Sequence, residues 1–278
     1  MDSTTSTPDS LFLIPRFIAK QALKFLIDSV FDIHVTGLEN IPKTGGAVFI
    51  SNHTDLVDIP VQGCYSERKI IYLGKYELFK PQEDILRYVK SPNSPFTQFP
   101  LSLTVPTIEL LANAVGERIA TQLKAWGGLP IIRNHFGAEK DKKAALNYYD
   151  ELETYMVEIV KSGEILSIYP EGTRTETGVM GPFKAIAARI AIRGNVPIIP
   201  SGIDGAHNAS KLENILSGKT YKAKITYNIG KPIQPSEFPQ GPEKKAAKEL
   251  TEILEKRVYA LKENPESSGP PKRFVTVL

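Results

Sequence analysis

Short apolar runs alternate along the chain with longer segments in which apolar residues recur every three or four positions. Runs of the first kind are typical of buried strands, and segments of the second kind are typical of helices that bury one face. Strands are expected at Ala47–Ile50, Lys69–Gly74, Pro130–Arg133, Ile165–Ile168, Pro197–Gly202 and Ala223–Ile229. Helices are expected at Val105–Lys124, Lys140–Ser162, Phe183–Arg193 and Pro242–Glu263. Because the two kinds of element alternate, the pattern predicts an α/β fold, with a mostly parallel mixed sheet covered by helices on both faces.

The N-terminal part of the chain predicts an amphipathic helix over Leu11–Phe31. Arg16, Lys20, Lys24 and Asp28 recur every four positions and form a narrow polar stripe on an otherwise apolar cylinder. Charges interrupt every long apolar stretch, so no membrane-spanning helix is predicted. The absence of lysine and arginine from the first ten residues argues against a cleaved signal peptide. We interpret the helix as one that lies in a membrane interface with its cations towards the headgroups; the alternative is a helix packed on its own domain.

Composition and patterning together suggest one main domain. The expected organisation is an N-terminal tail and membrane-associating helix over 1–31, one α/β catalytic domain over 32–264 and a mobile, proline-rich tail over 265–278. The 278 residues are 41% hydrophobic and carry a net charge of +3, which suits an anionic substrate or an anionic bilayer. No basic tract interleaved with aromatic residues is present, so no nucleic acid partner is expected. Cys64 is the only cysteine, which excludes an intramolecular disulfide, and we expect it to be buried.

Two motifs carry the candidate chemistry, and the first follows the strand at Ala47–Ile50. It reads Asn52-His53-Thr54-Asp55-Leu56-Val57-Asp58. Five residues of helix rotate a side chain by roughly 140°, so His53 and Asp58 can meet only if a turn separates them. Asp58-Ile59-Pro60 predicts a helix start after that turn. Asp58 would then hold the imidazole in one tautomer, and His53 would accept a proton from a substrate hydroxyl as general base.

The second motif follows the strand at Ile165–Ile168 and reads Tyr169-Pro170-Glu171-Gly172-Thr173-Arg174. A guanidinium group matches two phosphate oxygens at once, and a glycine-containing turn can present backbone amides to the same group. Both motifs lie where strands leave a sheet, which is where open α/β folds place their sites. We therefore predict that they form one active site.

Six motifs in this order resemble the glycerolipid acyltransferases that include the 1-acylglycerol-3-phosphate acyltransferases. The six are Val35-Thr36-Gly37-Leu38-Glu39-Asn40-Ile41-Pro42, the His53 motif, Lys75-Tyr76-Glu77-Leu78-Phe79, Leu129-Pro130-Ile131-Ile132-Arg133, the Arg174 motif and Val196-Pro197-Ile198-Ile199-Pro200. The resemblance implies that His53 is the general base and that Asp58 orients it. It also implies a phosphate-binding turn, made of Glu171, Gly172, Thr173 and Arg174, in which Glu171 fixes the turn or Arg174. Further substrate-binding candidates are Lys75, Arg133 and Lys184.

The implied activity is transfer of a fatty acyl group from a thioester to the free hydroxyl of 1-acylglycerol-3-phosphate, which gives phosphatidic acid. The donor would be acyl-CoA or acyl carrier protein, and neither a metal nor a redox cofactor is implied. The implied partners are a lysophospholipid acceptor and a membrane surface, with the enzyme peripheral or monotopic on the cytoplasmic face.

Three alternatives remain open. The acceptor could be glycerol-3-phosphate or another lysophospholipid. His53, Asp55 and Asp58 could instead be the metal ligands of a hydrolase, although no ligand-spaced cluster is formed by the remaining histidines, His34, His135 and His207. The third alternative is a catalytically silent membrane-binding protein, which the intact His53 and Asp58 disfavour.

The chain departs from the family pattern at three places. An insertion is expected around Pro81 to Ala125. Ala185-Ile186-Ala187 stands where the family usually has a glycine, and the motif near Ile132 lacks its usual aromatic residue. These departures concern acceptor specificity and leave the proposed base and its carboxylate untouched.

Overall fold

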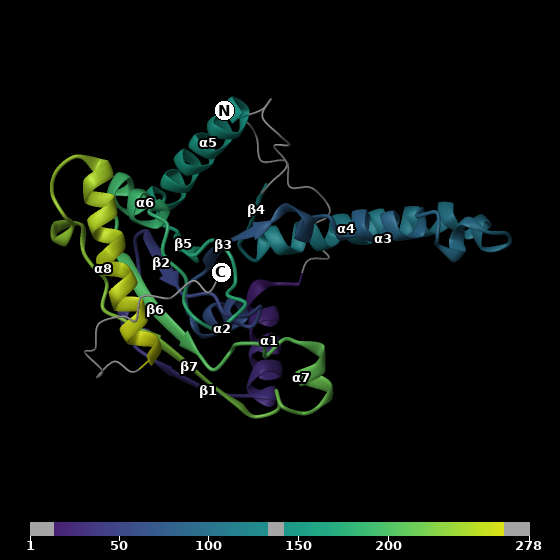
Figure 1. Ribbon diagram of the computed structural model, residues 1–278, viewed down its shortest axis with the longest axis horizontal. Coiled ribbons are helices and arrows are strands. Elements are labelled where there is room, and N and C mark those ends of the chain that lie inside the picture. Colours follow the sequence, from purple (N-terminus) through teal and green to yellow (C-terminus); the bar gives the residue numbers. More distant parts are fainter. Residues whose placement is uncertain (1–13, 133–141, 264–278) are drawn as a thin grey trace. The chain divides into compact units, whose positions relative to one another are not determined.

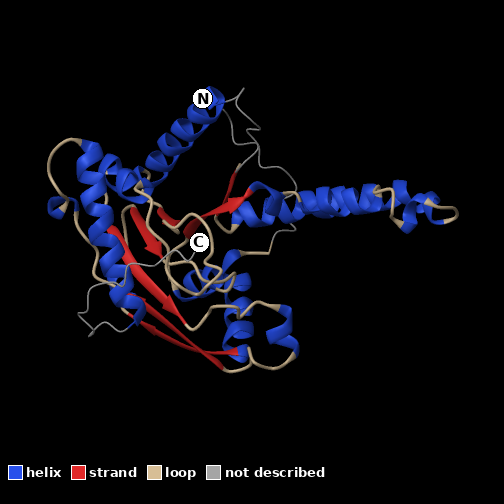
Figure 2. Cartoon of the chain, viewed as in Figure 1, coloured by secondary structure: helices blue, strands red, loops and turns tan. Residues whose placement is uncertain are grey.

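The computed structural model describes residues 14–132 and 142–263, which form one sheet and its surrounding helices (Figure 1, Figure 2). The strands are β1 (Phe31–Thr36), β2 (Ala47–Ser51), β3 (Ile70–Lys75), β4 (Gly128–Ile131), β5 (Ile165–Ile168), β6 (Ile198–Asp204) and β7 (Ala223–Ile229). The α-helices are α1 (Arg16–Val30), α2 (Asp58–Tyr65), α3 (Pro81–Val89), α4 (Val105–Ala125), α5 (Lys142–Lys161), α6 (Ile186–Gly194), α7 (Leu212–Leu216) and α8 (Glu243–Glu263). Arg133 and the predicted tail over 265–278 lie outside the described residues.

The sheet has seven strands in the order β1-β7-β6-β2-β5-β3-β4. β2 lies between β5 and β6 and runs parallel to both, and β5 is parallel to β3. β1 and β7 are also parallel to each other, while β6 and β7 pair antiparallel. The prediction of a mostly parallel mixed sheet is confirmed, and the two motif-bearing strands, β2 and β5, are neighbours near its centre.

Helices cover both faces of the sheet, as predicted (Figure 2). On one face, Ile27 of α1 and Val61 of α2 pack in one buried cluster with Phe49 of β2 and Ile199 of β6. On the other face, α5 packs against β5, α6 against β2, and α8 against β6 and β7. The apolar runs of the central strands are therefore buried from both sides, which explains why they lack alternation.

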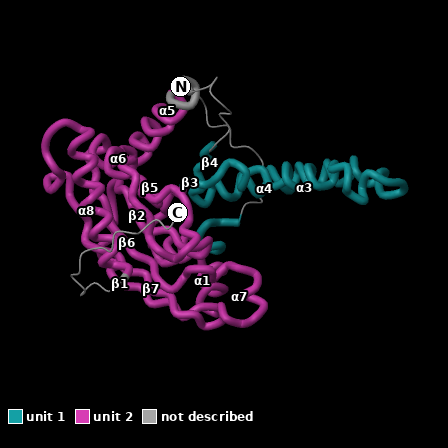
Figure 3. Tube along the Cα trace, viewed as in Figure 1, with its two compact units in different colours: residues 1–19, 73–137 teal, residues 20–72, 138–278 magenta. Residues whose placement is uncertain are grey.

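The chain divides into two compact units (Figure 3). The larger unit, residues 20–72 and 138–278, holds both motifs and most of the sheet. The smaller unit, residues 1–19 and 73–137, holds the end of β3, the helices α3 and α4, and β4. Within it, α3 and α4 pack against each other as a helical hairpin. The segment from Pro81 to Ala125, around which an insertion is expected, forms this hairpin.

Most predicted elements are present, with shifted ends. β4 begins two residues before the predicted strand, and α6 begins at Ile186 instead of Phe183. The helix expected at Pro242–Glu263, α8, buries an apolar stripe that includes Leu250, Leu254 and Val258. Cys64 is buried, as expected. Among the described residues no helix is long and apolar enough to cross a membrane.

The polar stripe of α1 faces the domain and not the solvent. Lys20 Nζ donates to the carbonyl oxygen of Ser66 at 2.6 Å, and Lys24 Nζ lies 4.3 Å from the centre of the Tyr65 ring. Phe25 on the same helix is 77% exposed. The expectation that Lys20 and Lys24 point towards headgroups is therefore wrong, because α2 offers them a carbonyl and an aromatic face. It is the apolar side of α1 that is exposed.

Candidate active site

His53 stands two positions beyond the end of β2, and Asn52, between them, fixes the chain there. The Asn52 side chain donates to the carbonyl oxygen of Ile203 and accepts from its amide, both at 2.8 Å. The carboxamide thus takes the place of a peptide group and continues the pairing of β2 with β6. It is fully buried and sets the point at which the chain leaves the sheet.

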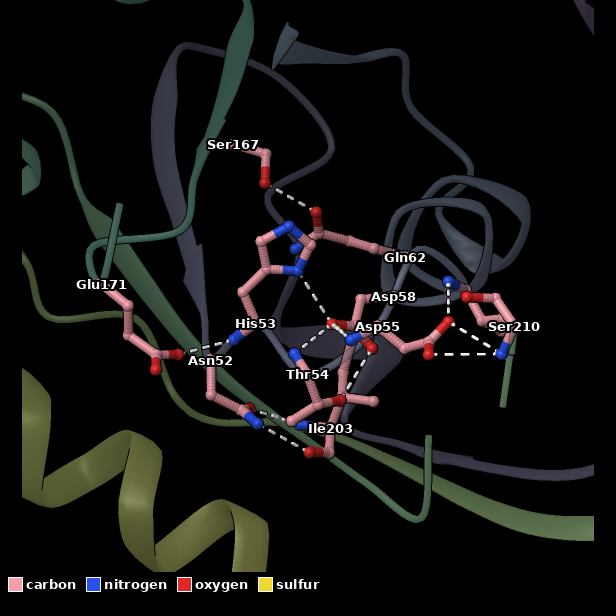
Figure 4. Close-up of polar contacts among 11 residues, drawn as sticks. Asn52, His53, Thr54, Asp55, Asp58, Gln62, Ser167, Glu171, Ile203 and Ser210 are labelled. Carbon is pink, nitrogen blue, oxygen red and sulfur yellow. Dashed lines mark hydrogen bonds and ion pairs between the residues drawn. The ribbon is translucent and has the colours of Figure 1, made fainter. Parts of the chain in front are cut away.

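His53 and Asp58 meet across the predicted turn (Figure 4). His53 Nδ1 lies 2.9 Å from Asp58 Oδ2, and Asp58 is the first residue of α2. The Asp58 side chain is completely buried, whereas the His53 side chain keeps 14% of its surface exposed. The second ring nitrogen, Nε2, has no hydrogen-bond partner in the described part of the chain, so it is free to face a substrate.

The turn between these residues holds the Asp58 carboxylate in one orientation. Oδ2 accepts from the amides of Thr54 and Asp55 at 2.5 and 2.8 Å, and Oδ1 faces the Thr54 hydroxyl at 3.1 Å (Figure 4). A carboxylate fixed by two amides requires a hydrogen on Nδ1 for its contact with His53. The network therefore assigns the tautomer in which Nε2 is the proton acceptor.

Asp55 stabilises the same turn through hydrogen bonds from two further backbone amides. Its carboxylate accepts from the amide of Val57 at 3.1 Å and from the amide of Ser210 at 3.2 Å. Both aspartates are thus satisfied by backbone amides, which is the arrangement of structural acceptors and not of a vacant ligand set. Among the described residues no group of three or more His, Cys, Asp or Glu side chains is placed to hold a metal ion.

Glu171 joins the two motifs. Its Oε1 accepts from the amide of His53 (Figure 4) and its Oε2 from the amide of Gly181, both at 2.6 Å. Burial raises the pKa of Glu171 to about 7, and the nearby charge of Asp58 adds to the shift while the two amides oppose it. In the reverse direction the Thr175 amide donates to the His53 carbonyl at 2.9 Å. The second motif is therefore attached directly to the backbone of the candidate base.

Tyr169 packs against the imidazole ring of His53. Its ring stacks on that of His53 with centroids 4.1 Å apart and planes inclined by 21°. The Tyr169 hydroxyl is buried, and burial raises its pKa well above the ordinary value. The ring thus restrains the tilt of the imidazole, while Asp58 restrains its rotation.

The second motif turns at Gly172 and exposes its basic residues. Gly172 has a φ of 78°, a conformation that glycine adopts without strain, and a Cβ at this position would lie 2.7 Å from Lys184 Nζ. Lys184 therefore lies over the turn, as the sequence suggested. Thr173 and Arg174 are exposed, and Arg174 makes no hydrogen bond or ion pair with any residue that the structure describes. The turn thus presents two cations at its surface, with an arginine free to bind an anion.

The substrate-binding roles predicted for Lys75 and Arg133 stay predictions. Lys75 ends β3, is exposed and belongs to the smaller unit. Arg133 lies outside the described residues. Sequence reasoning in turn missed Asn52, Tyr169 and Ser210, whose roles depend on strand pairing, ring stacking and a loop that is remote in the chain.

An apolar cavity of about 420 Å³ opens beside the turn. Helix α1, the start of β1, helix α7 and the loops on either side of α7 form its walls. The residues that line it are Leu26, Ile27, Val30, Phe31, Val57, Ala209, Ser210, Ile215, Thr220 and Tyr221. Val57 immediately precedes Asp58, so the cavity reaches the segment that holds the candidate base.

A family profile and individual relatives, compared with this chain, agree on the protein family that it resembles. The sequence profile of the Acyltransferase family matches residues 32–94 and 111–204. A 1-acyl-sn-glycerol-3-phosphate acyltransferase of Bacillus subtilis is 25% identical over 241 residues, which cover 86% of this chain and 93% of that protein. A Cocos nucifera protein of the same name is 28% identical over 113 residues, 41% of this chain and 35% of its own.

One solved structure shares the fold. The 1-acyl-sn-glycerophosphate acyltransferase PlsC of Thermotoga maritima superposes with a TM-score of 0.51 at 21% identity, covering 92% of this chain and 86% of its own. At this identity the likeness concerns the fold. It extends over nearly the whole chain, whereas the family profile leaves residues 95–110 unmatched.

Proposed function

Because the chain belongs to the acyltransferase family, we propose that it moves a fatty acyl group from a thioester to the free hydroxyl of 1-acylglycerol-3-phosphate. The product would be phosphatidic acid, and the donor would be acyl-CoA or acyl carrier protein. The names of the relatives support this acceptor. The observation that carries the proposal is the pairing of His53 with Asp58 at 2.9 Å, with Nε2 left open beside a basic turn.

In this reaction His53 Nε2 accepts the proton of the acceptor hydroxyl as its oxygen attacks the thioester carbonyl. The imidazolium that forms is stabilised by Asp58. When the tetrahedral adduct collapses, the carbon–sulfur bond breaks and the proton on Nε2 passes to the leaving thiolate. The base is then neutral again, so one cycle consumes and releases no net proton at His53.

Arg174 and Lys184 are the groups that we propose for the acceptor phosphate. Both are exposed cations on the second motif, and Glu171 ties that motif to the His53 amide. A phosphate held there would place the neighbouring hydroxyl near the imidazole, so a large part of the rate would come from positioning. The carbonyl oxygen of His53 accepts a hydrogen bond from the amide of Thr175, which is next to Arg174. This contact fixes the distance between the backbone of the general base and that of the phosphate-binding arginine.

The apolar cavity is our candidate for an acyl chain. Its walls are almost entirely aliphatic and aromatic, and Val57 connects it to the turn before Asp58. Three of the apolar residues that line it are also exposed to solvent, namely Leu26 of α1, Ile215 of α7 and Tyr221. A peripheral enzyme at the cytoplasmic face of a membrane could rest this surface on lipid and draw a chain from it. We therefore assign the membrane contact of α1 to its apolar side.

The decisive experiment incubates the purified protein with isotope-labelled acyl-CoA or acyl carrier protein and a panel of acceptors. The panel contains 1-acylglycerol-3-phosphate, glycerol-3-phosphate and lysophosphatidylcholine, and mass spectrometry identifies the acylated product. We expect phosphatidic acid, with a rate that falls by at least about 100-fold in His53→Ala. Acylation of another acceptor would change the substrate, and thioester hydrolysis that persists without His53 would refute the mechanism. A metal analysis of the active protein separates it from a metal-dependent hydrolase.

A further inference from the structure

The end of the α3–α4 hairpin carries no charge. From Ser91 to Ile108 the sequence contains no lysine, arginine, histidine, aspartate or glutamate. We call residues 91–108 the hairpin tip; it includes two short 3-10 turns, Pro95–Thr97 and Leu101–Thr104, and the first turn of α4. The family profile does not match residues 95–110, so most of the tip is an addition to the family pattern.

Large apolar side chains of the hairpin tip point into solvent. Phe99 is 82% exposed and Leu103 is 71% exposed, and Leu101 lies between them with a smaller exposed fraction. Leu110, just beyond the tip on α4, is also 71% exposed. Single exposed leucines are ordinary, but several on one uncharged protrusion mark an interaction site.

The charged residues of the hairpin begin where its tip ends. Lys90 Nζ pairs with Glu109 Oε1 at 2.9 Å, which joins the last turn of α3 to the first part of α4. Further towards the base of α3, Lys80 pairs with Glu83 and Arg87 with Asp84, both at 3.1 Å. The Lys90–Glu109 pair therefore marks the boundary between the uncharged tip and the charged rest of the hairpin, residues 81–90 and 109–125, which we call the shaft.

Most backbone amides of the hairpin tip that precede α4 are satisfied within the hairpin. Backbone amides before α4 donate to acceptors inside the hairpin at Ser91, Ser94, Phe96, Thr97, Gln98, Ser102 and Leu103. Four prolines, Pro92, Pro95, Pro100 and Pro106, have no amide hydrogen to satisfy. The hydroxyls of Thr97 and Thr104 donate to the carbonyls of Ser94 and Leu101 at 2.7 and 2.6 Å. Internal pairing of this kind lowers the cost of moving a segment from water into lipid.

We propose that the hairpin tip inserts into the interfacial layer of a lipid bilayer, with Phe99, Leu101 and Leu103 as its apolar anchors. A partner protein would cover one face of the hairpin and leave charged residues elsewhere around it. Here every residue at the end of the protrusion is uncharged, which matches immersion from all sides. Because the tip carries no cation, its binding needs no anionic lipid, unlike contacts made by basic helices.

This inference concerns the smaller unit and goes beyond the proposed reaction. It is tested by binding alone, so it stands or falls without any measurement of turnover. A loss of acyl transfer would refute the proposed function and leave the inference intact. A failure of the tip to enter lipid would do the reverse.

The test uses the full chain with a single cysteine that carries an environment-sensitive fluorophore. Cys64→Ala provides the background, and the label is placed by Leu103→Cys in the tip or, as a matched control, by Arg87→Cys in the shaft. Arg87 is well exposed and lies on the same hairpin, with a side chain that is 76% accessible. Vesicles of zwitterionic phosphatidylcholine, with and without brominated acyl chains, are the probe.

We expect the label at position 103 to shift to the blue and to be quenched by the brominated chains, at low and high salt alike. The label at position 87 should do neither. The double variant Phe99→Ser/Leu103→Ser should reduce the vesicle-bound fraction by about tenfold or more, while Tyr88→Ser in the shaft should leave it nearly unchanged.

Two results would overturn the inference. One is a label at position 103 that stays in a water-like environment at saturating vesicle concentration. The other is a blue shift without vesicles that grows with protein concentration, together with a larger species in sedimentation. That second result would identify the tip as a contact between copies of the chain.

Discussion

Asp58→Asn offers the sharpest test of the proposed mechanism, because the structure dictates how the new side chain must sit. Two amides, those of Thr54 and Asp55, donate to Asp58 Oδ2. Only the carboxamide oxygen can replace Oδ2, since an NH2 group there would face two donors. The NH2 group then lies opposite the Thr54 hydroxyl, which can accept from it. His53 Nδ1–H therefore still finds an oxygen, and the tautomer is retained.

What this substitution removes is the negative charge beside the imidazolium. Two unit charges about 4 Å apart interact by about 4 kcal/mol at the effective dielectric constant typical of proteins. Such a loss in the transition state corresponds to about a 1000-fold lower rate. Because the neutral hydrogen bond survives, we expect kcat/KM to fall by about 100- to 1000-fold. From sequence alone the larger loss of a wrong tautomer would be expected instead.

The assay measures thiol release from acyl-CoA in the presence of acceptor, with thermal unfolding as the control for folding. Asp58→Ala is the contrasting variant, because it leaves two buried amides without an acceptor and should cost about 1 to 3 kcal/mol of stability for each. A folded Asp58→Asn protein with activity within tenfold of the wild type would show that the charge is unimportant. A loss near 10,000-fold would show that the tautomer had changed, contrary to the amide argument.

Three further predictions concern the second motif. Arg174→Ala should raise the KM for a phosphorylated acceptor by about 10- to 100-fold through the loss of charged hydrogen bonds, with Arg174→Lys less affected; a larger effect on the thioester would place Arg174 on the donor side. Gly172→Ala should weaken acceptor binding in the same assay, because the new Cβ strains a φ of 78° and displaces Lys184, and an unchanged KM would remove Lys184 from the phosphate site. Burial raises the pKa of Glu171 from 4.5 to about 7, so the folded protein holds this proton more tightly than the unfolded chain does. That stabilisation is complete below pH 4.5 and is lost as the pH rises through 7, by about 3 kcal/mol in the free energy of unfolding. Glu171→Gln should abolish this slope in denaturant titrations, and an equally steep slope in the variant would assign it to another group.

Hydrophobic pattern was a good guide to the centre of the sheet but missed the strand at one of its edges. Strands β2 and β5 are continuous apolar runs buried on both faces, and such runs have few other interpretations. β1 was not predicted, because it follows α1 without a break and contains no apolar run; its alternation of apolar residues with Asp32 and His34 is the pattern of a strand buried on one face. An edge strand exposes one face, so its sequence is only half apolar.

The catalytic groups of the candidate site could be predicted from the sequence, whereas most of the contacts that hold them in place could not. The spacing of His53 and Asp58 demanded a turn, and the structure contains that turn. Its further support comes from residues far away in the chain and uses backbone amides: the Ser210 amide donates to Asp55, and the Gly181 amide donates to Glu171, which accepts from the His53 amide. Any residue except proline supplies a backbone amide, so no residue type in the sequence marks these positions.

Asn52 illustrates how a residue next to a catalytic group can be mistaken for part of the chemistry. Its side chain acts as one more peptide unit of β2, with a donor and an acceptor matched to Ile203. Aspartate lacks the donor and leucine lacks both groups, so neither isosteric replacement can continue the ladder. Variants at this position would therefore inactivate the enzyme by releasing the strand end. A screen that scored activity alone would count Asn52 as a third catalytic residue, although it never approaches the reacting atoms.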